Sequence, residues 1–344
     1  MRRRAARLPR LPRWRRGSVQ GRAVTAEAGS RPETRRFEVR AEDRLDRAVS
    51  LAVPALSRTQ ARRWVEEGRV RVDGATATKA STLVVAGQVV EVEFPATPAV
   101  DPRAVGVPLT VLYEDEHTLI LDKQPGLVVH PAEGLDEVTL IEAVAAHYPE
   151  VREIDDSDRG GVVHRLDRDT SGVIALAKSA EAQFILKEQF RLRETTKAYL
   201  ALVEGCPEPP EGIIDAPLGP DPTAPYRRAV VEHGQSAKSQ YRVLEQYGDE
   251  AALLEVRIFT GRTHQIRVHL TAVGHPVLGD TLYGHASDAI GRQALHAWRL
   301  GVTLASNGAW REFVAPLPED MRAAVRALRV RHPVRPAPEI GALA

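Results

Sequence analysis

The sequence predicts an α+β protein with two folded domains, and three observations predict this class. The chain has 344 residues, which suits two or three domains at ~100–200 residues each. Residues 37–95 combine helical and strand patterns, whereas from Leu109 onward short strands dominate. We therefore expect a small α+β domain, followed by a domain built on a mixed, mainly antiparallel sheet with flanking helices.

The composition is that of an ordinary globular protein, with 43% hydrophobic and 27% charged residues. The sequence contains no apolar stretch near the ~20 residues that cross a bilayer, so we expect no membrane association. Cys206 is the single cysteine, which excludes an internal disulfide framework and any multi-cysteine zinc site. A reducing, cytoplasmic location is the natural expectation.

Charge is distributed unevenly along the chain. Residues 1–36 hold twelve arginines against Glu27 and Glu33, a balance of +10, and the remainder has 35 basic and 44 acidic residues, or −9. The segment has no long apolar region, so it does not look like a secretory signal. We expect a disordered basic tail suited to a polyanionic partner.

The predicted first domain, residues 37–95, contains two helices and a few strands. Asp43 is placed to cap a helix that carries Leu45 and Val49. A second helix is expected to open at Ser57, where a glutamine three residues later fits a capping box, and to end at the glycine after "SRTQARRWVEE". "RVRVDG" predicts a strand entering a turn, and "STLVVAGQVVEVEF" predicts a further pair of short strands.

Arginines recur along this second helix and beyond it. Arg58 and Arg62 are four residues apart and thus neighbours on one helix face, and Arg63 and Arg69 extend the basic character. A solvated helix face would explain them equally well. However, "SRTQARRWVEEGRVRVDG" and the order of elements resemble the S4 RNA-binding domain over about sixty residues. The resemblance implies that Arg58, Arg62, Arg63 and Arg69 contact RNA backbone.

The second domain is expected at residues 109–330, after a Pro- and Ala-rich linker at 96–108 and before a Pro-rich tail at 331–344. "LTVLYEDEHTLILDK" predicts a hairpin, and "QPGLVVHP" predicts a turn and a strand. A helix is expected at 179–193, followed by the strand "AYLALVEG", the hairpin "YRVLEQYGDEAALLEVRIF", a helix beginning in "THQIRVHLTAVG" and a C-terminal helix in "LPEDMRAAVRALRV".

The stretch "HRLDRDTSG" concentrates two acids and two arginines beside the apolar run "VIALA". Loops on a rigid scaffold are where catalytic groups concentrate. A divalent metal at Asp167 and Asp169 is disfavoured, because a hard cation needs several oxygen ligands and Arg165 and Arg168 would compete with it. Nor do the histidines of "THQIRVH" suit a metal, since a spacing of five separates them by ~140° on a helix.

A carboxylate beside arginines stays ionised, because a nearby opposite charge depresses its pKa. Such a group suits a structural ion pair, and it equally suits attack or charge stabilisation at a sugar carbon. The residues alone leave both readings of Asp167 open.

Together, "HRLDRDTSG", "KAYLALVEG" and "TGRTHQIRVHL" resemble the pseudouridine synthases of the RluA/RluC/RluD-like branch, which modify ribosomal and transfer RNA. "DKQPGLVVHP", "GDTLYG" and "QALHAWRL" agree, and the resemblance covers residues 109–325. "DKQPG" stands where many relatives read closer to "NKPAG". An S4-like domain ahead of this unit is typical of the RluC/RluD type.

The resemblance implies roles for particular residues. Asp167 matches the catalytic aspartate, Tyr199 the tyrosine that stacks on the flipped uracil and a candidate for moving the C5 proton, and Arg262 the arginine that pairs with the aspartate. Arg165 and Lys178 are implied less directly, for phosphate contact or loop positioning. Attack of Asp167 at C1′ and a glycal route remain equally open.

The implied activity is isomerisation of specific uridines, chiefly in large-subunit ribosomal RNA. Neither a nucleotide cofactor nor a metal is expected, because no redox change or group transfer occurs. We expect a monomer with RNA as its partner and no obligate protein partner. Two alternatives are a non-catalytic S4-type RNA-binding factor, and an RNA N-glycosidase that would leave an abasic site.

Overall fold

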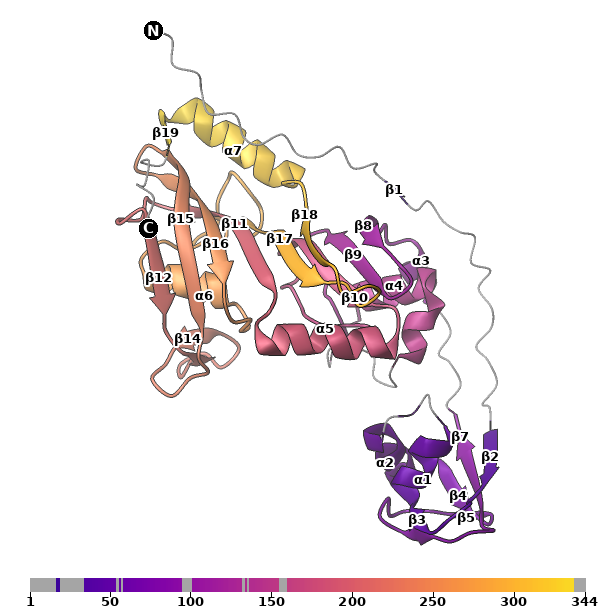
Figure 1. Ribbon diagram of the computed structural model, residues 1–344. Coiled ribbons are helices and arrows are strands. Elements are labelled where there is room, and N and C mark those ends of the chain that lie inside the picture. The colour runs from indigo at the N-terminus through magenta and orange to yellow at the C-terminus, as the bar shows by residue number, and fades with distance from the viewer. Residues whose placement is uncertain are drawn as a thin grey trace.

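The computed structural model describes residues 17–18, 34–53, 56, 58–94, 101–131, 134, 136–154 and 160–336. Within these ranges the chain packs as two units (Figure 1). One hydrophobic core is built from residues 39–92, and the other clusters are built from residues 119–328. The predicted α+β class is confirmed: helices and a large mixed sheet are both present.

The first unit is a four-stranded sheet, in the order β2-β7-β4-β5, with a two-stranded β3-β6 sheet and two helices. Its elements are β2 (Thr34–Glu38), β3 (Asp43–Arg44), α1 (Leu45–Ala52), α2 (Arg58–Glu66), β4 (Val70–Val72), β5 (Ala75–Thr76), β6 (Leu83–Val84) and β7 (Val89–Glu93). The turn between β4 and β5 places Asp73 and Gly74 at positive φ, +49° and +80°, as a tight hairpin requires.

Both predicted helices of this unit form, and the first differs from expectation at its N-terminal end. The prediction that Asp43 caps α1 is wrong: Arg44 occupies the N-cap position and makes no side-chain cap, while Asp43 accepts from the backbone N–H of Arg44. The expected capping residue of the second helix, Ser57, lies outside the described residues, and α2 ends before Gly68 at φ +74°. β2 begins at Thr34, inside the segment expected to be a tail.

The second unit is built on one large sheet, with eleven strands among the described residues. The central order is β9-β10-β17-β11-β16-β15, and only β10 and β17 run parallel. The strands are β1 (Gly17–Ser18), β8 (Thr110–Glu114), β9 (Thr118–Lys123), β10 (Ser171–Ala177), β11 (Thr196–Glu204), β12 (Glu211–Asp215), β15 (Lys238–Tyr247), β16 (Ala251–Ile258), β17 (Leu295–Thr303), β18 (Trp310–Val314) and β19 (Val334–Pro336). A separate two-stranded sheet pairs β13 (Leu218–Pro220) with β14 (Arg228–Val230).

Helices accompany this sheet. They are α3 (Pro102–Val105), α4 (Leu140–His147), a 3-10 helix (Pro149–Glu153), α5 (Ala180–Leu192), α6 (Gln265–Ala272) and α7 (Glu319–Arg331). Strand β10 is buried along its whole length and alternates between two cores: Val173 and Ala175 pack with Leu186 of α5, whereas Ile174 packs with Leu140 of α4. Figure 1 shows α5 lying across β10 and β17. Helices α4 and α5 thus pack against β10, the strand that directly follows the candidate site residues 164–170.

Three segments differ from expectation. The strand predicted in "QPGLVVHP" does not form, because the carbonyls of Val128 and Val129 accept from the first N–H groups of α4 instead. The expected linker contains α3, whose first turn is capped by Asp101. Part of the expected Pro-rich tail, β19, adds to the edge of the sheet beside β15.

Gly172 is the glycine on which the parallel pairing of β10 with β17 depends. It has φ +113°, and a Cβ placed there would lie 2.2 Å from the carbonyl oxygen of Ala297. Gly172→Ala should therefore lower the free energy of unfolding by about 3 kcal/mol or more, because the added Cβ would force the backbones of β10 and β17 apart and the φ angle is unfavourable for alanine. Gly291→Ala, with open space around its Cβ, should change it by less than about 0.5 kcal/mol. Denaturant unfolding measures both, and equal stabilities would contradict the close approach.

Candidate active site

Residues 164–170 form the connection that enters β10, and Asp167 lies within it. His164 fixes the start of the connection. Its Nε2 accepts the backbone N–H of Ala175 at 2.9 Å, and its ring stacks on Phe190 with the centroids 4.5 Å apart. Burial lowers the pKa of His164 to about 3, so its ring is neutral and serves as a structural acceptor.

Lys123, the last residue of β9, anchors the connection from one side. Its side chain is buried, and Nζ donates to the carbonyl oxygens of Gln124, Leu127 and Arg168 at 2.9, 2.8 and 2.8 Å. Burial lowers the pKa of Lys123 to about 7, against the opposing effect of nearby acidic side chains. One ammonium thus ties the backbone next to Asp167 to the turn after β9.

Arg292 anchors the same connection from the other side. Its Nη1 donates to the carbonyl oxygen of Asp169 at 2.8 Å, and its Nη2 donates to Ser171 Oγ at 3.3 Å. The carboxylate of Asp320, in the first turn of α7, binds the same guanidinium at 2.7 and 3.0 Å. The C-terminal helix therefore helps to hold the backbone that follows Asp167.

The Asp167 carboxylate is paired with Arg267, the third residue of α6. Arg267 Nη1 lies 3.2 Å from Asp167 Oδ2, while Nε and Nη2 bind both oxygens of Asp280 at 2.6 and 2.9 Å. The side chains of Arg267 and Asp280 are 7% and 1% exposed, whereas that of Asp167 is 19% exposed. Burial opposes the charge of Arg267, but the hydrogen bonds and charges of the two acids outweigh it and raise its pKa.

The prediction that Arg262 pairs with Asp167 is therefore wrong. Arg262 lies in the turn before α6, where its Nε donates to the carbonyl oxygen of Ser236 at 3.1 Å and its N–H donates to the side chain of Gln265. The pairing arginine, Arg267, stands in the same quoted motif five residues later. A signal was available, because an arginine inside the buried stretch of a helix requires a carboxylate partner.

His264 and Tyr283 complete the surroundings of the carboxylate. His264 sits at φ +57° before α6, with Nε2 4.0 Å from Asp167 Oδ2 and Nδ1 2.8 Å from Tyr283 Oη. Burial lowers its pKa, an effect that nearby arginines reinforce and the neighbouring acids oppose. The guanidiniums of Arg267 and Arg227 each lie 5.0 Å from the Tyr283 ring centroid. Sequence reasoning weighed His264 only as a metal ligand and assigned no role to Tyr283.

Tyr199 lies on β11, where it faces Ala297 of β17 and Val256 of β16. The residue is only 8% exposed. Burial, with a further contribution from the negative charge of Asp167, raises its pKa well above the usual range. Tyr199 is thus a neutral phenol, and it lies close enough to Asp167 for the charge of that carboxylate to raise its pKa.

The two remaining predicted residues of this unit lie in different surroundings. Arg165 is exposed and its charge acts on His264, so it lies beside the site. Lys178 follows the opposite end of β10 from Asp167, and its Nζ binds Glu114 Oε1 at 2.8 Å and lies over the ring of Tyr148. The structure does not bring Lys178 into the site.

The four predicted RNA-binding arginines of the first unit all have acidic neighbours. Arg62 pairs with Glu66 at 2.9 Å, and Glu67, just after the end of α2, pairs with both Arg63 at 3.2 Å and Arg69 at 2.8 Å. Arg58 binds Asp46 at 3.4 Å. Their side chains remain 35–66% exposed, so they stay accessible from solvent.

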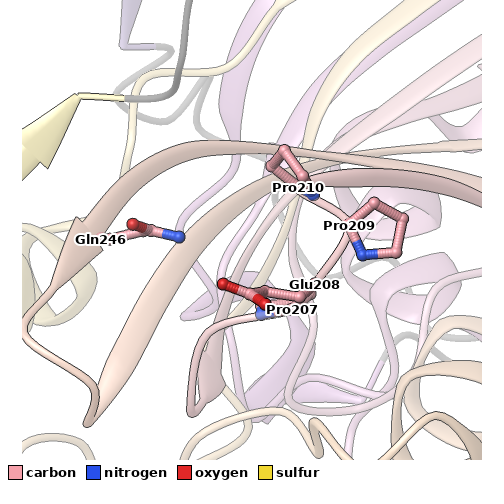
Figure 2. A pocket seen from close by; sticks show the side chains of 5 residues that line it. All are labelled: Pro207, Glu208, Pro209, Pro210 and Gln246. Atoms are coloured by element: carbon pink, nitrogen blue, oxygen red, sulfur yellow. The ribbon is translucent and has the colours of Figure 1, made fainter.

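Other features of the described residues lie apart from Asp167. A pocket of about 390 Å³ is lined by Pro207, Glu208, Pro209, Pro210 and Gln246 (Figure 2). None of the predicted site residues lines it. In the ranges that the structure describes, no group of three or more His, Cys, Asp or Glu residues is arranged to hold a metal ion, and no helix is both long and apolar enough to cross a membrane.

Comparison with known proteins identifies both units. A family model described as RNA pseudouridylate synthase matches residues 117–272, and the S4 domain model matches residues 43–90. The ribosomal large subunit pseudouridine synthase D of Nitrosomonas europaea is 40% identical over 326 residues, covering 89% of this chain and 91% of that protein. An uncharacterized RNA pseudouridine synthase of Chloroflexus aurantiacus is 44% identical over 291 residues, covering 84% and 91%.

The solved structure of human RNA pseudouridylate synthase domain containing 1 has a TM-score of 0.50 and 26% identity, covering 67% of this chain and 97% of that one. The fold and the matches define an RNA-modifying isomerase with an attached S4 domain. The chain belongs to the RNA pseudouridine synthase family.

The geometry predicts that Arg267 matters more than Arg262 for the rate of isomerisation. Arg267→Lys keeps a positive charge but cannot bind two carboxylates with one planar fork. We expect about a hundredfold lower single-turnover rate at saturating RNA, because the Asp167 carboxylate, the catalytic group that the sequence predicts, loses its position. Arg262→Lys, which leaves the Asp167 contact intact, should lose less than about tenfold. Equal losses in the two variants would show that Arg267 does not position Asp167.

Proposed function

We propose that this RNA pseudouridine synthase isomerises specific uridines of large-subunit ribosomal RNA, and that Asp167 is its catalytic carboxylate. The observation that carries the second part is the contact of Asp167 with the doubly held guanidinium of Arg267, in a position that stays partly open to solvent. The first part is supported by the relative from Nitrosomonas europaea and by further relatives that bear the name ribosomal large subunit pseudouridine synthase D.

The reaction involves the uracil and the ribose of the target nucleotide, and it requires one carboxylate held close to the ribose. The C1′–N1 bond of the uridine breaks, the uracil rotates, and C1′ bonds to C5, whose proton must leave. The proton that leaves C5 is balanced by one taken up at N1, so the product is an isomer of the substrate and no oxidant or group donor enters. Asp167 either attacks C1′ or takes the C2′ proton to give a glycal, and both roles require the carboxylate to be charged and held close to the ribose.

Arg267 supports either route because it fixes the position of the Asp167 carboxylate through one of its two oxygens. Arg267 Nη1 donates to Oδ2, and the hydrogen bonds of the described residues leave the second carboxylate oxygen available to the ribose. Since Asp280 binds the remaining side of the guanidinium, Arg267 need not reorganise when the substrate enters. Preorganised charge of this kind lowers a barrier without a cost at the moment of reaction.

Tyr199 contributes as a neutral aromatic side chain. The target uridine must leave its stack, which costs a few kcal/mol, and an aromatic platform recovers ~1–3 kcal/mol per stacked base. The raised pKa of Tyr199 disfavours a phenolate that would remove the C5 proton. We therefore assign Tyr199 to contact with the uracil rather than to base catalysis.

The arginines of the S4 domain supply RNA affinity in this proposal. Arg58, Arg62, Arg63 and Arg69 contact phosphates, because their side chains remain 35–66% exposed beside their acidic neighbours. Arg165, exposed next to the active site, contacts phosphate close to the target nucleotide. Each such contact adds to the salt dependence of binding through counterion release.

A complementation experiment tests both parts together. A strain that lacks the gene should lose pseudouridine at defined positions of large-subunit ribosomal RNA, and the wild-type gene should restore them. Asp167→Asn keeps the shape of the side chain and removes its charge, so it should restore none, with activity at least about a hundredfold lower in vitro. Asp169→Asn, whose backbone carbonyl rather than side chain is bound by Arg292, is the matched control and should restore them.

The outcomes separate the two parts. Loss of pseudouridine from transfer RNA alone would contradict the assigned substrate, but it would not contradict the catalytic role of Asp167. Full restoration by Asp167→Asn would contradict the catalytic assignment. Abasic sites in place of pseudouridine would identify an N-glycosidase instead.

A further inference from the structure

Asp46 is an unusual acid for the surface of an RNA-binding domain. It lies in the first turn of α1, and its side chain is only 4% exposed. Two arginines from different elements bind it: Arg44 from β3 and Arg58 from the start of α2. A buried charge is costly unless it is paired and hydrogen-bonded, and here both partners come from outside the helix that carries the acid.

The contacts fix the orientation of both guanidiniums. Arg44 binds in a two-pronged manner, with Nε 3.1 Å from Oδ1 and Nη2 3.0 Å from Oδ2. Arg58 Nε lies 3.4 Å from the same Oδ2. The hydrogen bond from Arg44 is the main cause of the lowered pKa of Asp46, and the charge of Arg58 adds to it. The carboxylate is therefore ionised and shared by two cations.

Both arginines remain half open to solvent. Their side chains are 45% and 57% exposed. A guanidinium carries five N–H donors, and the contacts with Asp46 use two of them on Arg44 and one on Arg58. Without Asp46 between them, two neighbouring cations would repel each other, and each long side chain would sample many rotamers. Asp46 thus holds donors side by side that would otherwise separate.

We propose that Arg44 and Arg58 form a binding site for a phosphate of the RNA backbone, and that Asp46 is the residue that positions them. A guanidinium pair with free donors matches the oxygens of a phosphodiester. RNA is the occupant because the chain is an RNA pseudouridine synthase with an S4 domain. The inference rests on RNA binding by this domain and does not depend on which RNA carries the target uridine.

A positioning role for Asp46 and its negative charge alone predict opposite effects of Asp46→Asn on RNA affinity. Asp46→Asn removes one negative charge from an RNA-binding face, so simple electrostatics predicts tighter binding. If Asp46 positions the arginines, the same change should weaken binding, because the RNA must then order two mobile side chains itself. Glu66→Gln is the matched control: it removes one negative charge from the same unit, at a glutamate that is 50% exposed and pairs with Arg62 on the same helix, α2.

The test uses the full-length protein and a labelled RNA stem–loop of arbitrary sequence, with dissociation constants measured at several salt concentrations. We expect Asp46→Asn to bind about fivefold more weakly than wild type, and Glu66→Gln to bind as tightly as wild type or more tightly. Asp46→Asn binding as tightly as Glu66→Gln would overturn the positioning role. The single-turnover isomerisation rate of Asp46→Asn at saturating substrate RNA should equal that of wild type. A result that contradicts the phosphate site therefore appears in the dissociation constant, whereas a result that contradicts the proposed catalytic site appears in the rate.

A second comparison covers the case in which Asp46→Asn does not fold, which a thermal melt detects. Arg44→Gln and Arg58→Gln should each reduce the slope of log affinity against log salt by roughly 0.7–0.9, the loss of one phosphate contact. Arg47→Gln, which removes an exposed arginine of α1 that pairs with Asp43 of β3, should leave the slope unchanged. Equal slopes for all three variants would overturn the site.

Discussion

The ion pair between Arg267 and Asp280 is the interaction on which the candidate active site depends. Asp280 is almost fully buried, accepts the backbone N–H groups of Leu282 and Tyr283, and binds Arg267 through both of its oxygens. The guanidinium is thereby fixed in the interior, with Nη1 directed at Asp167. A single buried cation thus binds two acids, and the more exposed of them is Asp167, the carboxylate that we propose to be catalytic.

The rest of the site holds the backbone around Asp167 and leaves its side chain accessible. Lys123 binds the carbonyl of Arg168, and Arg292 binds the carbonyl of Asp169. The first anchor comes from β9, and the second links the connection to α7. The charged residues of "HRLDRDTSG" therefore differ in how they are held: Asp167 is bound through its carboxylate by Arg267, whereas Arg168 and Asp169 are bound through their main-chain carbonyls.

Much of the fold could be predicted from the sequence, because α5, α7, β11 and the β15–β16 hairpin have clear periodicity and turn residues. The strand expected in "QPGLVVHP" could not be excluded from its pattern, since the donors that claim its carbonyls come from α4, farther along the chain. Asp167 could be singled out from the sequence because its charged neighbours are adjacent in the chain, and its catalytic role stays a prediction. The partner of Asp167 was misassigned because Arg262 and Arg267 share one motif, and only the start of α6 decides which of them turns inward.

The most direct test of this account is the single-turnover rate of Asp280→Asn at saturating RNA, measured beside the dissociation constant for the same RNA. Asp280 lies behind Arg267 and does not contact Asp167 in the hydrogen bonds of the described residues. If Arg267 positions the catalytic carboxylate, the rate should fall about 10- to 100-fold with nearly unchanged RNA affinity in a folded protein. A folded Asp280→Asn enzyme with the wild-type rate would contradict the central claim.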